Sequence, residues 1–169
     1  MNKNHYKAVA IGARSKAAGD LFENMVNEAC KYYSDRGEAE IEKTPEPMKP
    51  IRRLEGGKFV SVYTKMAQPD YKGTFLGGKS IVFEAKHTDS DRLKRDVVSE
   101  EQEKRLERHY LLGADCFIII SFGFQKFFKV PWHLFRDMKK IYGRKYLVPQ
   151  DLKNYEIKYI GGILRFLYQ

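Results

Sequence analysis

Residues 68–86 constrain the fold more than any other segment of the chain. Their sequence, QPDYKGTFLGGKSIVFEAK, has a Gly-Gly pair in the middle, which favours two antiparallel strands joined by a turn. Because successive side chains of a strand alternate between its faces, Glu84 and Lys86 lie on the same face as Val82. Across the turn, Asp70 returns beside Glu84. The hairpin therefore predicts two carboxylates and one ammonium group at one strand end.

Two carboxylates held close together repel each other, and a divalent cation between them removes this repulsion. Mg²⁺ takes one or two carboxylates, keeps several waters and grips phosphate oxygens. It polarises the phosphoryl group and helps to generate hydroxide, while a lysine offsets charge on the phosphate. Asp70, Glu84 and Lys86 thus fit a metal-dependent phosphodiester-cleaving site. The alternative is a turn-forming aspartate beside a surface ion pair, because the bare D…ExK pattern is common by chance.

The charge balance favours an anionic partner. The 169 residues include 31 Lys and Arg against 22 Asp and Glu, which gives a formal net charge of +9. Nucleic acid is the first candidate, since no basic amphipathic helix with a Trp or Phe face supports membrane binding. Cys30 and Cys116 lie in apolar stretches and predict buried thiols in a reducing compartment. No apolar run has the length of a signal peptide or membrane span, so we expect a cytoplasmic protein.

The periodicity of apolar residues predicts a mixed sheet between helices. Residues 18–33 have helical spacing, and Ser99 with Gln102 fits a capping box that begins a second helix over 99–112. Residues 39–43, 114–122 and 126–130 have the composition of strands, and the second of these is apolar enough to be buried on both faces. A short helix over 132–142 and a late hairpin over 155–167 follow. The polar residues 87–92 predict a loop.

Two basic segments flank the first helix and the strand after it. Residues 1–17 predict either a loose arm that contacts a partner or a disordered tail. Three prolines within residues 44–50 exclude a helix and a central strand, so residues 44–65 predict a stiff basic protrusion, with a long surface loop as the alternative. The basic residues expected to grip phosphates are Arg14, Lys16, Lys43, Lys49, Arg52, Arg53 and Lys58.

The order of these motifs resembles the PD-(D/E)XK nuclease superfamily. Within it, the chain is similar to the RecU family of Holliday junction resolvases from Gram-positive bacteria and some of their phages. The segments that carry the resemblance are Phe22-Glu23, IEKTPEP at 41–47, DYKG at 70–73, FEAK at 83–86 and Gln102. The resemblance implies an α/β, restriction-endonuclease-like fold: a mixed central sheet flanked by helices, with residues 44–65 as a proline-bearing stalk. It implies one nuclease domain over residues 1–169.

The resemblance also implies an activity. RecU-like enzymes are homodimers that make paired nicks in a four-way DNA junction with Mg²⁺, and we expect Mn²⁺ to substitute. By matching position, Asp70 and Glu84 would hold the metal, and Gln102 would be a further residue on the metal side. Lys86 would stabilise the transition state, and the stalk would enter the junction.

Three of these positions keep more than one interpretation. Gln102 either caps its helix with Ser99 or points into the site, and the resemblance favours the site. Glu23, on the first helix, either influences the site indirectly through the residues around it or is a solvated helix residue. Family members usually carry Thr two residues before the Asp, where this chain has Gln68, whose amide oxygen can reach a metal directly or through water.

Two other classes of function stay open at this point. One is a different endonuclease on the same fold, restriction-like or acting in repair or replication. The other is a non-catalytic DNA-binding module that kept the fold, although the intact Asp70, Glu84 and Lys86 argue against it. The four histidines show no metal-ligand spacing, and the chain has no P-loop and no GxSxG motif.

Overall fold

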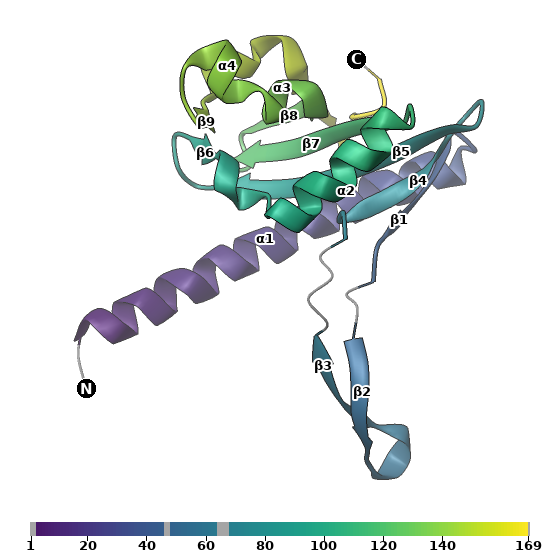
Figure 1. Cartoon of the computed structure of the whole chain (residues 1–169), viewed down its shortest axis with the longest axis vertical. Helices are drawn as coiled ribbons and strands as arrows, with labels where there is room; N and C mark the ends of the chain where they lie inside the picture. The colour runs from purple at the N-terminus through teal and green to yellow at the C-terminus, as the bar shows by residue number, and fades with distance from the viewer. Residues whose placement is uncertain (1–2, 46–47, 64–67, 169) are drawn as a thin grey trace.

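A six-stranded mixed sheet forms the centre of the molecule (Figure 1). The computed structural model describes residues 3–45, 48–63 and 68–168. Neighbouring strands follow the order β1-β4-β5-β7-β8-β10, and all pairs are antiparallel except β5 with β7, which is parallel. The strands are β1 (Ala39–Lys43), β4 (Tyr71–Phe75), β5 (Lys79–Thr88), β7 (Asp115–Phe122), β8 (Lys126–Pro131) and β10 (Glu156–Ile157).

Helices cover both faces of this sheet (Figure 1). Helix α1 (Lys3–Asp35) packs on one face, while α2 (Glu100–Leu111), α3 (Trp132–Arg136) and α4 (Met138–Tyr142) lie on the other. The mixed sheet flanked by helices is therefore confirmed. The short elements are η1 (Glu55–Gly57), β6 (Leu93–Lys94), η2 (Arg95–Val97), β9 (Tyr146–Leu147), η3 (Pro149–Tyr155), β11 (Tyr159–Ile160) and β12 (Ile163–Leu164).

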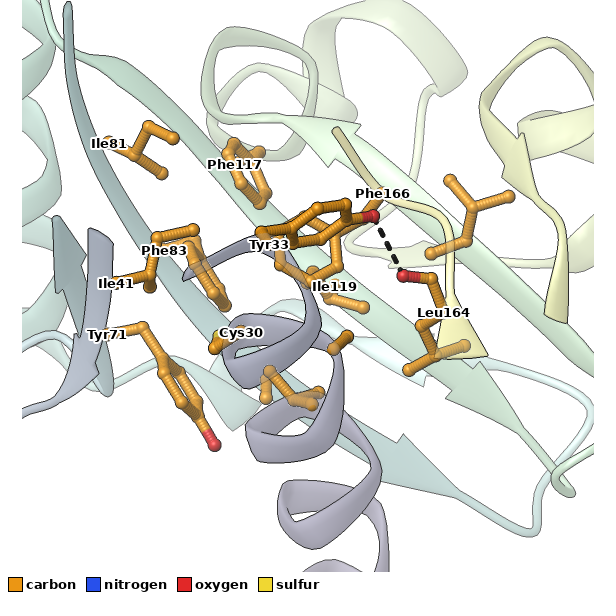
Figure 2. Packing of buried hydrophobic residues seen from close by; sticks show 14 of the residues in the cluster. Cys30, Tyr33, Ile41, Tyr71, Ile81, Phe83, Phe117, Ile119, Leu164 and Phe166 are labelled. Carbon is orange, nitrogen blue, oxygen red and sulfur yellow. Dashed lines mark hydrogen bonds between the residues drawn. The ribbon is translucent and has the colours of Figure 1, made fainter. Parts of the chain in front are cut away.

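The alternation of side chains along β5 divides the core into two layers. Phe83 is fully buried on the α1 side, where its ring stacks between Tyr71 and Phe117 with centroids 4.8 Å from each. Figure 2 shows this cluster around the end of α1. Val82 packs in the opposite layer with Leu106 of α2. Glu84 and Lys86, at even spacing from Val82, consequently face α2.

Close packing of β1 on β4 depends on Gly73. A Cβ atom at this position would lie 2.1 Å from the carbonyl oxygen of Glu40, a distance that side-chain rotation cannot relieve. The glycine of the DYKG segment thus lets β1 pair with the strand that follows Asp70.

Helix α1 is longer than the sequence predicted. It begins at Lys3 rather than at residue 18, so the described part of the predicted loose arm is helical. Its apolar face is buried between Phe22 and Tyr33, whereas Arg14 and Lys16 are exposed where the helix extends past the sheet (Figure 1). The periodicity failed here because residues 10–17, whose side chains are exposed, need no apolar stripe. Residues 1 and 2 lie outside the described residues.

A two-stranded hairpin projects from the sheet between β1 and β4 (Figure 1). Strand β2 (Met48–Arg53) pairs antiparallel with β3 (Phe59–Tyr63), and we call residues 48–63 the stalk hairpin. All described side chains from Met48 to Val62 are exposed. The register shifts between Pro50 and Arg52, where proline has no N–H for the ladder. Residues 46, 47, 64 and 65 of the predicted protrusion lie outside the described residues.

The loop predicted over residues 87–92 begins later than expected. His87 and Thr88 continue β5 and pair with Ser121 and Phe122 of β7, so this part of the prediction was wrong. The His87 side chain is 4% exposed, and its ring contacts Ser121 Oγ at 3.0 Å. These polar residues were assigned to a loop because polarity alone does not reveal pairing with a buried strand.

Both cysteines are free and buried, as predicted. Burial raises the pKa of the Cys30 and Cys116 thiols to about 12, which keeps them protonated and unreactive at neutral pH. Within the described chain, no helix combines the length and the apolar character needed to cross a membrane.

Candidate functional site

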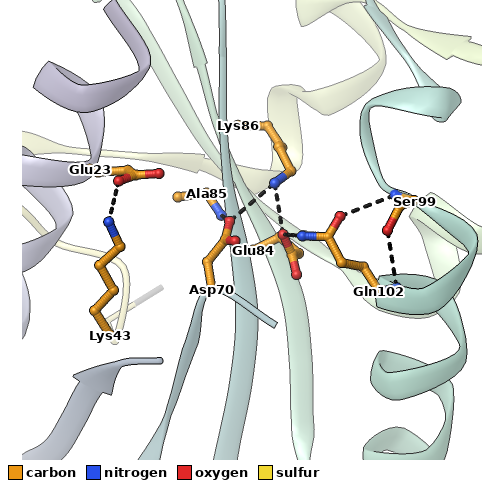
Figure 3. A network of polar contacts seen from close by, with 8 residues as sticks. All are labelled: Glu23, Lys43, Asp70, Glu84, Ala85, Lys86, Ser99 and Gln102. Atoms are coloured by element: carbon orange, nitrogen blue, oxygen red, sulfur yellow. Dashed lines mark hydrogen bonds and ion pairs between the residues drawn. The ribbon is translucent and has the colours of Figure 1, made fainter. Parts of the chain in front are cut away.

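Asp70, Glu84 and Lys86 meet where the β4–β5 hairpin opens toward α2 (Figure 3). Lys86 Nζ lies 3.1 Å from Asp70 Oδ2 and 2.7 Å from Glu84 Oε2. The Asp70 and Lys86 side chains are 20% and 19% exposed, while Glu84 is completely buried. Two carboxylates and an ammonium group therefore share one partly closed site with access to solvent on the Asp70 side.

Asp70 is held from the strands on both sides. The backbone N–H of Thr44, just after β1, donates to the Asp70 carbonyl oxygen at 2.8 Å. The backbone N–H of Ala85 donates to Asp70 Oδ2 at 3.1 Å. Since β4 begins only at Tyr71, the carboxylate takes the place of a strand carbonyl and satisfies the Ala85 amide. This bond fixes Asp70 beside Glu84.

Glu84 is a buried acid with one partnered oxygen and one without a partner. Its Oε2 accepts from Lys86 Nζ and from Gln102 Nε2, at 2.7 and 2.6 Å. Its Oε1 is buried and has no hydrogen-bond partner among the described residues. Burial raises the pKa of Glu84 to about 8; Lys86 opposes this shift and Asp70 adds to it. A buried carboxylate oxygen without a partner costs free energy until a donor or a cation reaches it.

Lys86 stays a cation in this environment. Burial acts to lower the pKa of Lys86, but the Glu84 and Asp70 carboxylates outweigh it, and the pKa is raised. Lys86 balances one of the two carboxylates, so ionisation of Glu84 leaves one negative charge without a counter-ion. A divalent cation would compensate that charge and reach the unpaired Glu84 Oε1, and would thereby favour the ionised form of Glu84.

The donor set suits a hard cation with few protein ligands. In the described part of the chain, no three His, Cys, Asp or Glu side chains gather into a metal-binding group. Asp70 and Glu84 therefore supply two carboxylates, the number that Mg²⁺ accepts when waters and substrate phosphates fill its other positions. Zinc and calcium favour richer protein coordination. The residues present fit Mg²⁺.

Gln102 both caps its helix and points into the site, the two positions that the sequence left as alternatives, while its role on the metal side stays a prediction. Its Oε1 accepts from the Ser99 backbone N–H at 3.1 Å, and its backbone N–H donates to Ser99 Oγ at 3.3 Å, which completes the capping box of α2. At the same time its Nε2 donates to Glu84 Oε2 (Figure 3). The helix cap thus orients the amide toward the buried acid, and the two roles do not need two conformations.

Two other predicted site residues have partners of their own. Glu23 on α1 forms an ion pair with Lys43 at the end of β1, beside the Asp70 cluster in Figure 3. The Gln68 amide oxygen accepts from Lys72 Nζ at 2.9 Å. Within the described residues, no hydrogen bond or ion pair joins the side chain of Glu23 or Gln68 to the Asp70 cluster. Their catalytic and metal-binding roles stay predictions.

The residues expected to bind DNA occupy two projections and one strand end. Arg14 and Lys16 are exposed on the part of α1 that passes the sheet, and Lys43 ends β1. The stalk hairpin carries four more exposed basic residues, namely Lys49, Arg52, Arg53 and Lys58.

Sequence reasoning missed three basic side chains near the site. Lys72 follows Asp70 by two residues on β4, and Arg105 and His109 follow Gln102 by three and seven residues on α2. The signal was present, because these spacings put Lys72 on the strand face of Asp70 and the two α2 residues on the helix face of Gln102. All three side chains are partly buried.

Comparison with known proteins identifies the family. The family model of RecU, Recombination protein U, matches residues 17–168. The chain belongs to the RecU family. This RecU match includes all the segments on which the resemblance was based, from Phe22-Glu23 to Gln102.

Several streptococcal RecU proteins are relatives of this chain. Holliday junction resolvase RecU from Streptococcus pneumoniae (strain Hungary19A-6) is 31% identical over 114 residues, which cover 64% of this chain and 57% of that protein. The protein of the same name from Streptococcus sanguinis (strain SK36) is 32% identical over 114 residues, covering 62% and 55%. The matched segment thus spans less than two thirds of the length of these relatives.

A solved structure supports the fold. Hjc, a Holliday junction resolvase from Archaeoglobus fulgidus, superposes with a TM-score of 0.50 at 10% sequence identity, over 81% of this chain and 93% of that chain. The predicted fold class, an α/β restriction-endonuclease-like fold, is confirmed.

Proposed function

We propose that this RecU-family chain is a Mg²⁺-dependent DNA endonuclease that resolves four-way junctions by paired nicks. The observation that carries the proposal is the contact of Lys86 with both Asp70 and Glu84, beside a Glu84 oxygen that is buried without a partner. A pair of acids beside a lysine, with one of the acids buried, suits cleavage of a phosphodiester far better than passive DNA binding, which needs no buried acids.

Asp70 and Glu84, with the Ala85 carbonyl oxygen, would hold Mg²⁺. When bound, the ion polarises the phosphoryl group and lowers the pKa of a bound water. Gln102 keeps the Glu84 carboxylate in one orientation through its amide donor. Lys86, anchored by both carboxylates, offers an ammonium group to the negative charge that grows on the phosphate or to the attacking water.

The stalk hairpin supports a branched substrate. It is inserted in the chain between β1 and β4, the strands that hold Asp70, and it projects from the sheet (Figure 1). A projecting, basic, two-stranded ribbon can enter the open centre of a four-way junction but has no matching space in a linear duplex. Contacts from its basic residues to phosphates carry no sequence code, so shape decides the preference. Paired nicks require two sites, which a homodimer supplies.

The nicking of synthetic DNA by the purified protein tests this function. The substrates are a four-way junction, a flap and a linear duplex of matched length, each with Mg²⁺, with Mn²⁺ and with EDTA. We expect metal-dependent symmetrical nicks in the junction, similar cleavage with Mn²⁺, and little cleavage of the other two substrates. Equal cleavage of all three would point to a different endonuclease of this fold. Binding without cleavage in any metal would overturn the nuclease proposal.

The proposed metal site predicts a stabilisation that can be measured without DNA. Mg²⁺ at one hundred times its Kd should stabilise the folded state by about 2.7 kcal/mol, which raises the Tm by roughly 5 to 10 °C. Glu84→Gln should abolish this shift because it removes a carboxylate that would hold the ion. Glu42→Gln, at an exposed glutamate of β1, is the matched control and should retain it. A Glu84→Gln variant with the full Mg²⁺ shift would contradict the site.

The stalk hairpin should determine substrate preference through its charge. We expect the quadruple variant Lys49→Gln, Arg52→Gln, Arg53→Gln, Lys58→Gln to bind junctions with a flatter salt dependence, the slope falling by up to about 0.9 for each phosphate that the hairpin no longer neutralises. Duplex affinity should change much less. Fluorescence anisotropy across a salt series measures both, and a parallel decrease on the two substrates would refute a junction-specific role.

A further inference from the structure

Helix α2 brings a second set of charged groups to the site. The Gln102–Glu84 hydrogen bond of 2.6 Å fixes the first turn of α2 above β5. Arg105 and His109 lie on the same helix face, and seven residues of helix rise about 10.5 Å. Helix α2 packs against β5 and β7, and β4 is the neighbour of β5 on its other side (Figure 1). The face that carries Gln102 therefore runs away from the site along this face of the sheet.

Lys72 faces this helix from β4. It pairs in register with Val82, which is buried in the α2 layer, and lies two residues beyond Asp70, about 6.6 Å along the strand. The Lys72 and Arg105 charges lie close enough to repel each other, and both disfavour the protonated form of His109. Lys72, Arg105 and His109, which we call the basic row, thus begin at the site and follow the space between β4 and α2.

No ion pair neutralises the basic row in the part of the chain that the structure describes. Lys72 Nζ donates to the neutral Gln68 amide, and Glu42, which pairs in register with Lys72, forms no ion pair with it. Burial, Lys72 and Arg105 together lower the pKa of His109. Two partly buried cations without an ion-pair partner repel each other, and an anion between them would relieve this repulsion.

We propose that the basic row binds DNA phosphate next to the cleaved phosphodiester and thereby seats the cut strand between β4 and α2. This inference rests on the proposed nuclease function. Arg105 supplies a planar fork of donors suited to phosphate, Lys72 supplies a point charge and His109 supplies an imidazole hydrogen bond. The row would act on the strand that is cut, whereas the stalk hairpin acts on the branch point.

The chain contains a matched control for the test. Arg105→Ala and Arg108→Ala remove the same group from the same helix, but Arg108 is exposed, whereas Arg105 is partly buried and interacts with Lys72. In EDTA, Arg105→Ala should weaken binding to both junction and duplex about tenfold and reduce the salt slope by about 0.7 to 0.9. Arg108→Ala should change affinity less than twofold. Lys72→Ala should behave like Arg105→Ala, and Lys79→Ala on β5 should behave like Arg108→Ala.

KM and kcat distinguish weaker binding of the cut strand from damage to the catalytic site. With Mg²⁺, Arg105→Ala should raise KM about tenfold while kcat changes less than threefold, and Arg105→Lys should recover part of the loss. Unchanged binding and KM in both Arg105→Ala and Arg105→Gln, with wild-type melting, would overturn the basic row and leave the nuclease intact. If the wild-type protein cuts no substrate, the nuclease proposal fails, and the EDTA binding series still decides whether the row binds phosphate.

Discussion

Asp70→Asn and Lys86→Ala should each abolish nicking of a four-way junction while leaving DNA binding in place. Lys86 contacts Asp70 at 3.1 Å and Glu84 at 2.7 Å, and each substitution removes one charged group from this cluster. Removal of one such electrostatic group costs about 10²–10³-fold in rate, and loss of a metal ligand adds to this. In Asp70→Asn, the side-chain amide oxygen can still accept from the Ala85 N–H, so the strand end should keep its geometry.

Single-turnover cleavage with Mg²⁺ measures the rates, and anisotropy in EDTA measures the binding. Asp91→Asn and Lys79→Ala make the same chemical changes at exposed positions of the same region and should cut at the wild-type rate. Junction nicking by Asp70→Asn or Lys86→Ala at the wild-type rate would show that the acids and the lysine are structural. Loss of binding as well as cutting would mean that the variant had not kept its fold, which melting would reveal.

The central part of the site was predictable from the sequence because local rules determine it. The period of two along a strand put Glu84 and Lys86 on one face, and the turn at Gly77-Gly78 brought Asp70 back to them. The capping box likewise placed Gln102 in the first turn of α2. What the pattern did not give was the angle at which α2 crosses β5, and that angle lets one amide both cap the helix and reach Glu84.

Contacts between distant elements were not predictable in the same way. The Glu23–Lys43 ion pair joins α1 to β1, and nothing in the sequence around either residue indicates which residue it pairs with. The basic row was missed for the same reason, since Lys72 and Arg105 become neighbours only when α2 packs on the face of the sheet that carries Lys72. The prolines predicted an extended stalk, but the register in which residues 59–63 pair with residues 48–53 was not predictable from them. Side chains without an apolar stripe, as in the first turns of α1, gave no periodicity to follow.

The aromatic stack behind the site should make the largest contribution of any single side chain to stability. Phe83 is fully buried, and its ring lies 4.8 Å from both Tyr71 and Phe117 and 5.4 Å from Phe166. Phe83→Ala leaves a cavity between three strands and α1, and should lower the free energy of unfolding by about 3 to 5 kcal/mol. The Tm should fall by roughly 10 °C, since a domain of this size loses about 2 to 4 °C per kcal/mol.

Phe59→Ala makes the same substitution on the stalk hairpin, where Phe59 is 56% exposed, and should change stability by no more than about 0.5 kcal/mol. Urea unfolding of the two variants, followed by circular dichroism, compares them directly. Phe83 faces α1 while the next residue, Glu84, faces α2, so the stack sets the position of the strand that carries the buried acid without touching it. Similar unfolding midpoints for the two variants would mean that the sheet does not depend on this stack for its packing against α1.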